Sequence, residues 1–156
     1  MSVETVKKYF AKLGVRQQVM EFETSSATVE LAAKALQTKP ERIAKTLSFK
    51  KGDRCFLVVT AGDTKIDNQK FKAEFETKAK MLSPEEAFTL TGYKIGGVCP
   101  FAVPADVSVY LDISLQRFET VFPACGSSNS AIELTCDELF RYGNAVKWVN
   151  VCKGRE

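Results

Sequence analysis

The sequence predicts a single α+β domain with a mixed β-sheet. Its 156 residues suit one domain of ordinary size. The composition, 45% hydrophobic and 26% charged, is that of a globular protein with its own core, not of a disordered or disulfide-stapled chain. Short apolar strands are mixed with short capped helices, without the regular spacing of β-α-β units. No internal repeat or low-complexity linker divides the chain, so we expect residues 1–156 to form one domain.

In the first half of the chain, hydrophobic periodicity and turn residues define the expected elements. Apolar residues three and four positions apart predict a helix that Gly14 ends, and Thr28 is placed to cap a second helix. Two apolar runs around a polar, glycine-containing turn predict a β-hairpin with a longer loop. The expected elements are a helix over 2–13, a short strand over 18–22, a helix over 29–36, a turn at Pro40, strands over 43–50 and 55–61, and a turn over 51–54.

In the second half, capping residues predict three helices. Asp67 is a good N-cap for a helix over 68–75, and Ser83 before Pro84 starts a helix that Gly92 ends. A capping box over 135–138 starts a helix that ends at Gly143. The other expected elements are an apolar loop over 96–104, strands over 107–111, 120–124, 131–134 and 145–151, and a short helix near 114–118.

The absence of histidine excludes more chemistry than any other count. A Ser-His-Asp triad, a Cys-His pair, a histidine-ligated zinc and a histidine general base are all impossible. Catalysis must then use other side chains, backbone amides or the substrate itself. The nucleotide-binding patterns G-x-G-x-x-G and G-x-x-x-x-G-K-[ST] are also missing. We therefore expect neither a cofactor nor a metal.

The cysteines and the apolar runs indicate the compartment. Five cysteines, an odd number with no C-x-x-C pair, are typical of reduced thiols. The longest unbroken apolar run, over 55–59, is far shorter than the ~20 residues of a membrane span. No apolar segment follows the lysines near the N-terminus, as a signal peptide would require. We expect a cytoplasmic protein without membrane contact.

The net charge of +3 is unevenly distributed. Residues 34–80 carry 12 basic and 6 acidic side chains, whereas residues 106–138 carry 1 basic and 6 acidic side chains. The basic segment is compatible with a face that meets a phosphate-bearing partner. Charge alone favours the simpler interpretation, a solvated, lysine-rich surface.

Lys45 is the sharpest local signal. Side chains alternate along the strand over 43–50, so Lys45 shares a face with Ile43, Leu47 and Phe49. A lysine on an apolar face costs free energy unless its ammonium is paired or reaches a cavity. Two interpretations stay open: a cation that points into a pocket toward a phosphate or carboxylate, or a lysine whose stem is buried and whose ammonium reaches water.

Two segments of small residues are candidate ligand contacts. In Gly96-Gly97-Val98-Cys99-Pro100, glycines allow a ligand to approach the backbone, and exposed amides could stabilise an oxyanion. In Gly126-Ser127-Ser128, small residues and hydroxyls after a strand could line a pocket. Both segments could instead be plain turns. The Cys99 thiol could be a nucleophile or a buried, inert group.

Taken in order, these segments resemble the YbaK/ProX family of free-standing aminoacyl-tRNA deacylases, which are similar to the editing domain of bacterial prolyl-tRNA synthetases. The resemblance rests on Ala44-Lys45-Thr46-Leu47, on the loop from Thr91 through Pro100, and on the segment from Gly126 to Leu134. It covers residues 20–150. It implies a compact α+β fold around a curved, barrel-like mixed sheet flanked by short helices.

The resemblance also implies an activity and a site. The activity is hydrolysis of the ester between a wrong amino acid and its tRNA, most often cysteine or alanine on proline tRNA. Lys45 would anchor the 3′-terminal adenosine, and backbone amides of Gly96, Gly97, Val98 and Cys99 would polarise the ester. Substrate contacts would fall on Thr46, Pro100, Gly126, Ser127 and Ser128. A hydroxyl or thiol of the substrate would assist the attack, so no protein general base is required.

The expected partners are aminoacyl-tRNA, held by its terminal adenosine, and prolyl-tRNA synthetase, and we expect a monomer. Two functions from other classes remain as alternatives. One is a non-catalytic RNA-binding module on the same fold, which would bind tRNA in a salt-dependent way without turnover. The other is a small-molecule or thiol-binding protein that uses Cys99 and an apolar pocket.

Overall fold

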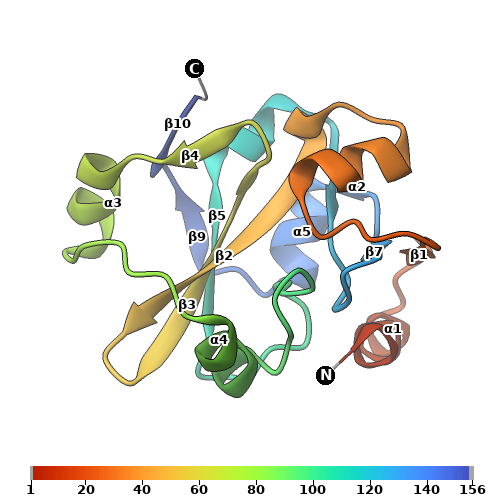
Figure 1. The fold of residues 1–156 in the computed structure, drawn as a ribbon, viewed down its shortest axis with the longest axis horizontal. Coiled ribbons are helices and arrows are strands. Elements are labelled where there is room, and N and C mark those ends of the chain that lie inside the picture. The colour runs from red at the N-terminus through yellow and green to blue at the C-terminus, as the bar shows by residue number, and fades with distance from the viewer. Residues whose placement is uncertain (1, 155–156) are drawn as a thin grey trace.

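A computed structural model describes residues 2–154 and has a curled, six-stranded mixed sheet at its centre (Figure 1). The strand order is β8-β6-β2-β3-β5-β9, in which β2 and β3 form an antiparallel hairpin. The pairs β2–β6, β3–β5 and β5–β9 are parallel, whereas β6–β8 is antiparallel. Two short antiparallel ladders, β1–β7 and β4–β10, stand beside the sheet. The expected α+β class with a curved mixed sheet is confirmed.

The strands are β1 (Met20–Glu21), β2 (Ile43–Lys51), β3 (Arg54–Ala61), β4 (Thr64–Ile66), β5 (Ser108–Asp112), β6 (Thr120–Pro123), β7 (Ser130–Ala131), β8 (Leu134–Thr135), β9 (Lys147–Val149) and β10 (Cys152–Gly154). The helices are α1 (Val3–Leu13), α2 (Val29–Leu36), α3 (Asn68–Phe75), α4 (Pro84–Thr91) and α5 (Cys136–Tyr142), with 3₁₀ turns η1 (Pro40–Arg42) and η2 (Ile113–Arg117). The α2 and α3 bounds agree with the sequence prediction, because Thr28 and Asp67 cap these helices as expected.

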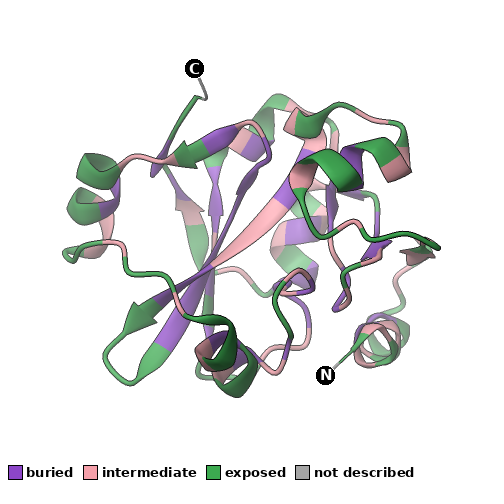
Figure 2. Ribbon diagram, viewed as in Figure 1, coloured by how far each residue is buried: buried purple, intermediate pink, exposed green. Residues whose placement is uncertain are grey.

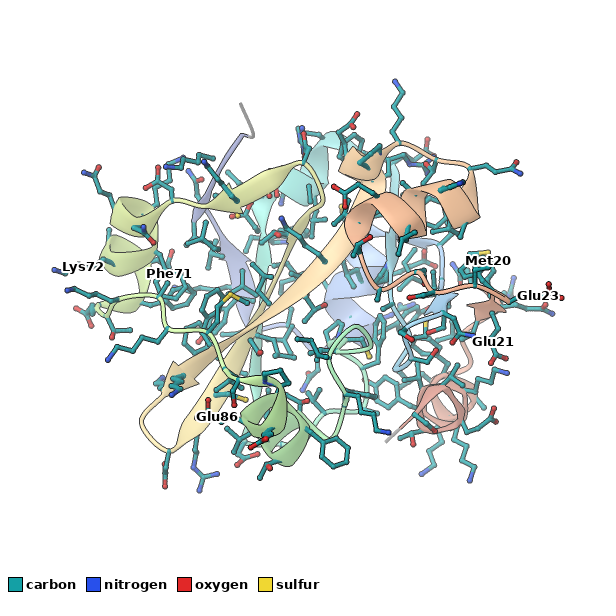
Figure 3. All side chains as sticks on the ribbon, viewed as in Figure 1. Met20, Glu21, Glu23, Phe71, Lys72 and Glu86 are labelled. Carbon is teal, nitrogen blue, oxygen red and sulfur yellow. The ribbon has the colours of Figure 1, made fainter. Side chains whose placement is uncertain are left out.

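Both faces of the sheet are covered, which explains the unbroken apolar run in β3. On one face, β3 and β5 pack with α1 and α5 in the main core. On the other face, Phe56 and Val58 of β3 pack with Phe71 of α3. The buried residues accordingly follow the central strands, and the outer helix faces are exposed (Figure 2). Side chains show the same division on α3, where Phe71 points toward the sheet and Lys72 points away (Figure 3).

The β2–β3 hairpin is tighter than predicted. Lys51 pairs with Arg54, so the loop is only Gly52 and Asp53 rather than a longer connection. Gly52 has a φ of +63°, a conformation that glycine adopts without strain. The short loop extends the pairing to the hairpin tip, where Lys50 and Lys51 lie beside residues 77–80.

Two expected strands near the C-terminus were wrong. The run 131–134 splits into β7, which pairs with β1, and β8, which pairs with β6. The run 145–151 splits into β9 in the main sheet and β10, which pairs with β4. Apolar character continues through both breaks because Ile132 and Val151 are buried outside strands. Hydrophobicity therefore marked burial at these positions but not strand pairing.

Within residues 2–154, none of the helices combines the length and the apolar character that crossing a membrane requires.

Candidate functional site

A cavity of about 300 Å³ opens at one edge of β2. Its walls are β2, the first turns of α2 and α4, the loop around Gly96, and the ends of β6 and β7. Many lining residues are small, with alanines at positions 32, 44, 87, 124 and 131. Met81 and Ile95 also line it and are 57% and 68% exposed, which places apolar side chains where the cavity meets solvent.

The cavity occupies a gap in the pairing of β2. On the side away from β3, β2 pairs with β6 only at Ile43 and Ala44. Pairing on this side resumes further along, where Leu82 N–H donates to the Ser48 carbonyl at 3.1 Å and Lys50 N–H donates to the Lys80 carbonyl at 2.7 Å.

Thr46 lies in that gap. Backbone groups alternate in direction along a strand, so the amide and carbonyl of Thr46 point the same way as those of Ser48, toward the cavity. No strand pairs with Thr46 on this side. The Thr46 hydroxyl is buried, and it has no hydrogen-bond partner within residues 2–154. Thr46 thus presents polar backbone to a cavity that a ligand could fill.

Lys45 lines the cavity with its partly buried side chain. The register of β2 and β3 sets it opposite Thr60, on the face that carries Leu47 and Phe49 as predicted. Its ammonium donates a hydrogen bond to the Thr64 carbonyl at the start of β4. The stem is therefore buried against the sheet while the charge is held at the end of β3.

The turn that presents the Thr64 carbonyl is fixed by an ion pair. Arg117 of η2 donates two hydrogen bonds to the Asp63 carboxylate, at 2.9 and 2.5 Å. These bonds hold the pKa of Asp63 below its usual value, and Lys45 adds a smaller effect in the same direction. Asp63 and Arg117 therefore position the acceptor that holds the Lys45 ammonium.

Two helices begin at the cavity. Thr28 caps α2 by accepting a hydrogen bond from Leu31 N–H at 3.1 Å. Ser83 caps α4 by accepting one from Glu86 N–H at 3.1 Å. The first turn of a helix carries partial positive charge. With Lys45, these two ends favour an anionic or strongly polar ligand.

The glycine loop is built by close packing of two backbones. Gly96 has a φ of +87°. A Cβ on Gly97 would lie 2.9 Å from both the N and Cα atoms of Ser127, so only glycine fits there. The amide of Gly97 donates to the Lys94 carbonyl at 3.0 Å, within the turn. Gly97 thus joins the two small-residue segments, while Gly96 and Val98 face the cavity.

The Gly126–Ser128 segment is hydrogen-bonded to the loop that precedes α2. The Ser128 carbonyl accepts hydrogen bonds from the backbone N–H and hydroxyl of Ser26. The Ser127 hydroxyl donates to Asn129 Oδ1 at 2.9 Å. The two bonds from Ser26 hold residues 25–28, which lead into α2, beside the cavity. Gly126, Ser127 and Ser128 themselves do not line it.

The Cys99 side chain is fully buried beside Tyr93 and Phe101, outside the cavity lining. Burial raises the pKa of its thiol to about 12, so the thiol stays protonated at neutral pH. A nucleophilic cysteine needs a thiolate. Pro100 is also buried and packs against Gly143 at the end of α5. Neither side chain contacts the cavity.

Of the residues expected to form the site, Lys45, Thr46, Gly96 and Val98 line the cavity. The others, Gly97, Cys99, Pro100, Gly126, Ser127 and Ser128, lie outside its lining. Sequence reasoning missed the lining residues at the starts of α2 and α4 and along 81–83. Thr28 and Ser83 were visible only as helix caps. Nothing in their local pattern indicates that both caps face β2.

Comparison with known proteins identifies a family and several similar proteins. The family model described as the aminoacyl-tRNA editing domain matches residues 23–142. The uncharacterized protein YwhH of Bacillus subtilis (strain 168) is 54% identical over the full length of both chains. Proline--tRNA ligase of Geobacillus sp. (strain WCH70) is 30% identical over 65% of this chain, and the match spans 18% of the ligase.

A solved structure, described as that of a proposed trans-editing enzyme for prolyl tRNA synthetase, superposes with a TM-score of 0.88. The two chains are 26% identical, and the alignment covers 97% of each. The family match spans the cavity walls from α2 through β7, including Lys45, Thr46 and the glycine loop. From the shared fold and this sequence match, we conclude that the chain belongs to the aminoacyl-tRNA editing domain family.

Proposed function

We propose that this protein is a trans-editing hydrolase that removes a wrong amino acid from tRNA, with cysteine or alanine on proline tRNA as the substrate. The observation that carries the proposal is the position of Lys45 and Thr46 at the unpaired edge of β2, in a cavity lined by small residues. The similarity to proline--tRNA ligases supports proline tRNA. The protein would act as a single domain and a monomer in the cytoplasm, with prolyl-tRNA synthetase as its partner in editing.

The cavity suits an aminoacylated adenosine. Its alanine-lined interior accommodates a small amino-acid side chain and excludes a larger one by size, which is the logic of editing. Met81 and Ile95 at the mouth offer apolar contacts to the adenine base. Lys45 and the first turns of α2 and α4 favour the phosphate and the polarised ester oxygens.

The reaction adds water to the ester carbonyl and breaks the bond to the ribose oxygen, which takes a proton. The products are the free amino acid and a tRNA with both terminal hydroxyls restored. Backbone amides of cavity-lining residues, those of Thr46, Gly96 and Val98, would stabilise the oxyanion that develops. The vicinal ribose hydroxyl, or a cysteine substrate's thiol, would assist the attack, so a site without histidine suffices.

The test is deacylation of tRNAs charged with cysteine, alanine, serine or proline by the wild type and by Lys45→Ala. We expect fast release of one non-cognate amino acid and a loss of about 100-fold or more in kcat/KM for Lys45→Ala. Lys12→Ala, an exposed lysine on α1, is the matched control and should keep wild-type activity. Thermal unfolding of each variant separates loss of function from loss of fold.

Turnover of none of the four substrates by the wild type would overturn the proposal. If tRNA still bound at low salt, the chain would instead be a non-catalytic RNA-binding module. Full activity in Lys45→Ala would reject the role of the lysine while leaving the activity in place.

A further inference from the structure

A second cavity, of about 410 Å³, lies at the tip of the β2–β3 hairpin. It is enclosed by the hairpin, the end of α3 and the segment 77–80. Its lining combines lysines with aromatic rings: Lys50, Lys51, Lys78 and Lys80, with Phe56, Phe75 and Tyr110. None of its lining residues is acidic. The proposed reaction does not use this cavity.

The rings form a packed floor. The Phe75 and Tyr110 ring centroids are 5.0 Å apart at an interplanar angle of 72°, and those of Phe56 and Phe75 are 4.7 Å apart. Phe56 is buried, whereas Phe75 and Tyr110 are only half-buried. Aromatic side chains therefore line a cavity that solvent reaches.

The lysines form a cationic rim. Lys50 makes an ion pair with Glu86 of α4 at 3.2 Å. Lys51, Lys78 and Lys80 are exposed and take part in none of the salt bridges found within residues 2–154. Three cations thus surround an aromatic floor without a carboxylate in the lining. Lysine binds phosphate as a point charge, and aromatic faces stack with any base. The combination is typical of single-stranded nucleic-acid binding.

This cavity and the candidate site share two neighbouring segments of the chain. Both are lined by β2 and by the segment 77–84, which hydrogen bonds tie together at Lys80 and Leu82. Lys45 and Lys51 are six residues apart on β2, or about 20 Å. A nucleic-acid strand with stacked bases spans that distance with about six nucleotides, and an extended strand spans it with fewer.

We propose that the hairpin-tip cavity binds the single-stranded RNA that precedes the terminal adenosine, with phosphates on Lys51, Lys78 and Lys80 and a base against Phe75 and Tyr110. This inference rests on the proposed function, because it assumes that the terminal adenosine occupies the cavity at Thr46. The second cavity supplies affinity for tRNA and takes no part in the reaction.

The test compares a triple variant, Lys51→Gln with Lys78→Gln and Lys80→Gln, with a control triple, Lys8→Gln with Lys12→Gln and Lys65→Gln. The control lysines are exposed on α1 and β4, away from both cavities. Each is assayed on full-length aminoacyl-tRNA and on 3′-aminoacyl-adenosine, which lacks upstream phosphates. Affinity for uncharged tRNA is measured by fluorescence anisotropy.

For the hairpin-tip triple variant, we expect a tenfold or greater loss of kcat/KM on tRNA, mostly through KM, and no change on aminoacyl-adenosine. The slope of log affinity against log salt should become shallower by about 2, since three single-strand phosphate contacts are lost. The control triple should behave as wild type on aminoacyl-adenosine and keep the wild-type KM on tRNA. Phe75→Leu, once shown to fold, should weaken tRNA binding about fivefold or more through lost stacking.

Equal affinity of the wild type and the hairpin-tip triple for uncharged tRNA would overturn the inference. The inference would also be overturned if the triple variant lost as much affinity for a blunt RNA duplex without a single-stranded 3′ end. The lysines would then contact the phosphates of base-paired RNA. These outcomes are distinct from failure of the proposed function, in which the wild type hydrolyses neither substrate.

Discussion

Thr46 and Thr60 each bury a hydroxyl that has no hydrogen-bond partner within the described residues. Such a hydroxyl costs about 1–3 kcal/mol of folding free energy. The two positions differ in one respect: Thr46 lines the cavity, whereas Thr60 lies within the sheet outside it. A site that binds a polar ligand can leave a hydroxyl without a protein partner, because the ligand supplies one.

We predict that Thr46→Val and Thr60→Val each raise the free energy of unfolding by about 1 kcal/mol, since valine keeps the shape and removes the polar atom. Only Thr46→Val should lower kcat/KM for deacylation, about 10-fold, because the substrate would lose a hydrogen bond. Urea unfolding and deacylation of the two variants test this together. Unchanged activity in Thr46→Val would assign the substrate contact to the Thr46 backbone instead.

At the scale of single residues, the sequence identified Lys45 because a cation on an apolar strand face costs free energy unless its ammonium is paired or reaches a cavity. It could not identify where the ammonium points. The acceptor, the Thr64 carbonyl, is fixed by the pairing of Asp63 with Arg117, residues 54 positions apart. Nor could sequence separate residues that line the cavity from those behind it. Gly96 and Gly97 are identical neighbours in the sequence, and they differ only through the backbone conformation and packing of the folded chain.

At the scale of elements, α2 and α3 are both eight residues long and both begin with a side-chain cap, but only α2 begins at the cavity. Thr28 accepts one backbone hydrogen bond, and Asp67 accepts two. Loss of either cap should cost about 1 kcal/mol of stability. The two helices therefore allow a matched comparison of stability with function.

We predict that Thr28→Ala and Asp67→Ala lower stability to a similar degree, while only Thr28→Ala raises KM for aminoacyl-tRNA, by about threefold or more. The physical reason is that fraying of the first turn of α2 moves one wall of the cavity. Thermal melts and steady-state kinetics supply the two readouts. A similar rise in KM in both variants would show that the effect follows global stability rather than the position of α2.

Elements with local signals were predictable, and elements defined by distant partners were not. Thr28 and Asp67 fixed the starts of α2 and α3, because a cap acts within three residues. The three residues of β4 were missed, since they form a strand only by pairing with β10, almost ninety positions later. The break between β9 and β10 has the same cause. Partners that distant leave no trace in local hydrophobic periodicity.

For the molecule as a whole, the ionisable groups predict how stability depends on pH. The pKa values of Asp63, Asp67 and Glu86 are lowered, chiefly by hydrogen bonds from Arg117 and from the backbone N–H groups of Lys70 and Ser83 respectively. The unfolded chain therefore binds protons before the folded chain as pH falls. These groups contribute stability that is present above about pH 4 and is lost as pH falls through their folded pKa values.

The cysteines affect stability at alkaline pH. Burial raises the pKa of all five thiols, to about 12 for Cys99 and for Cys152. Above about pH 8.5, thiols of the unfolded chain ionise, whereas the same thiols in the folded chain ionise only at higher pH. This difference favours unfolding, so the stability present below pH 8.5 is lost as pH rises. Each such thiol contributes a slope of up to about 1.4 kcal/mol per pH unit.

Between these limits the chain has no histidine to titrate. We therefore predict a urea midpoint that is flat between about pH 5.5 and pH 8 and falls on both sides. Asp63→Asn should reduce the acid slope, and Cys125→Ala should reduce the alkaline slope, whatever each does to stability at pH 7. Unfolding midpoints from pH 3 to pH 10 measure both slopes. A midpoint that changes by more than the experimental error between pH 6 and pH 7.5 would contradict this account, because the sequence holds no histidine, the side chain that ordinarily titrates in that range.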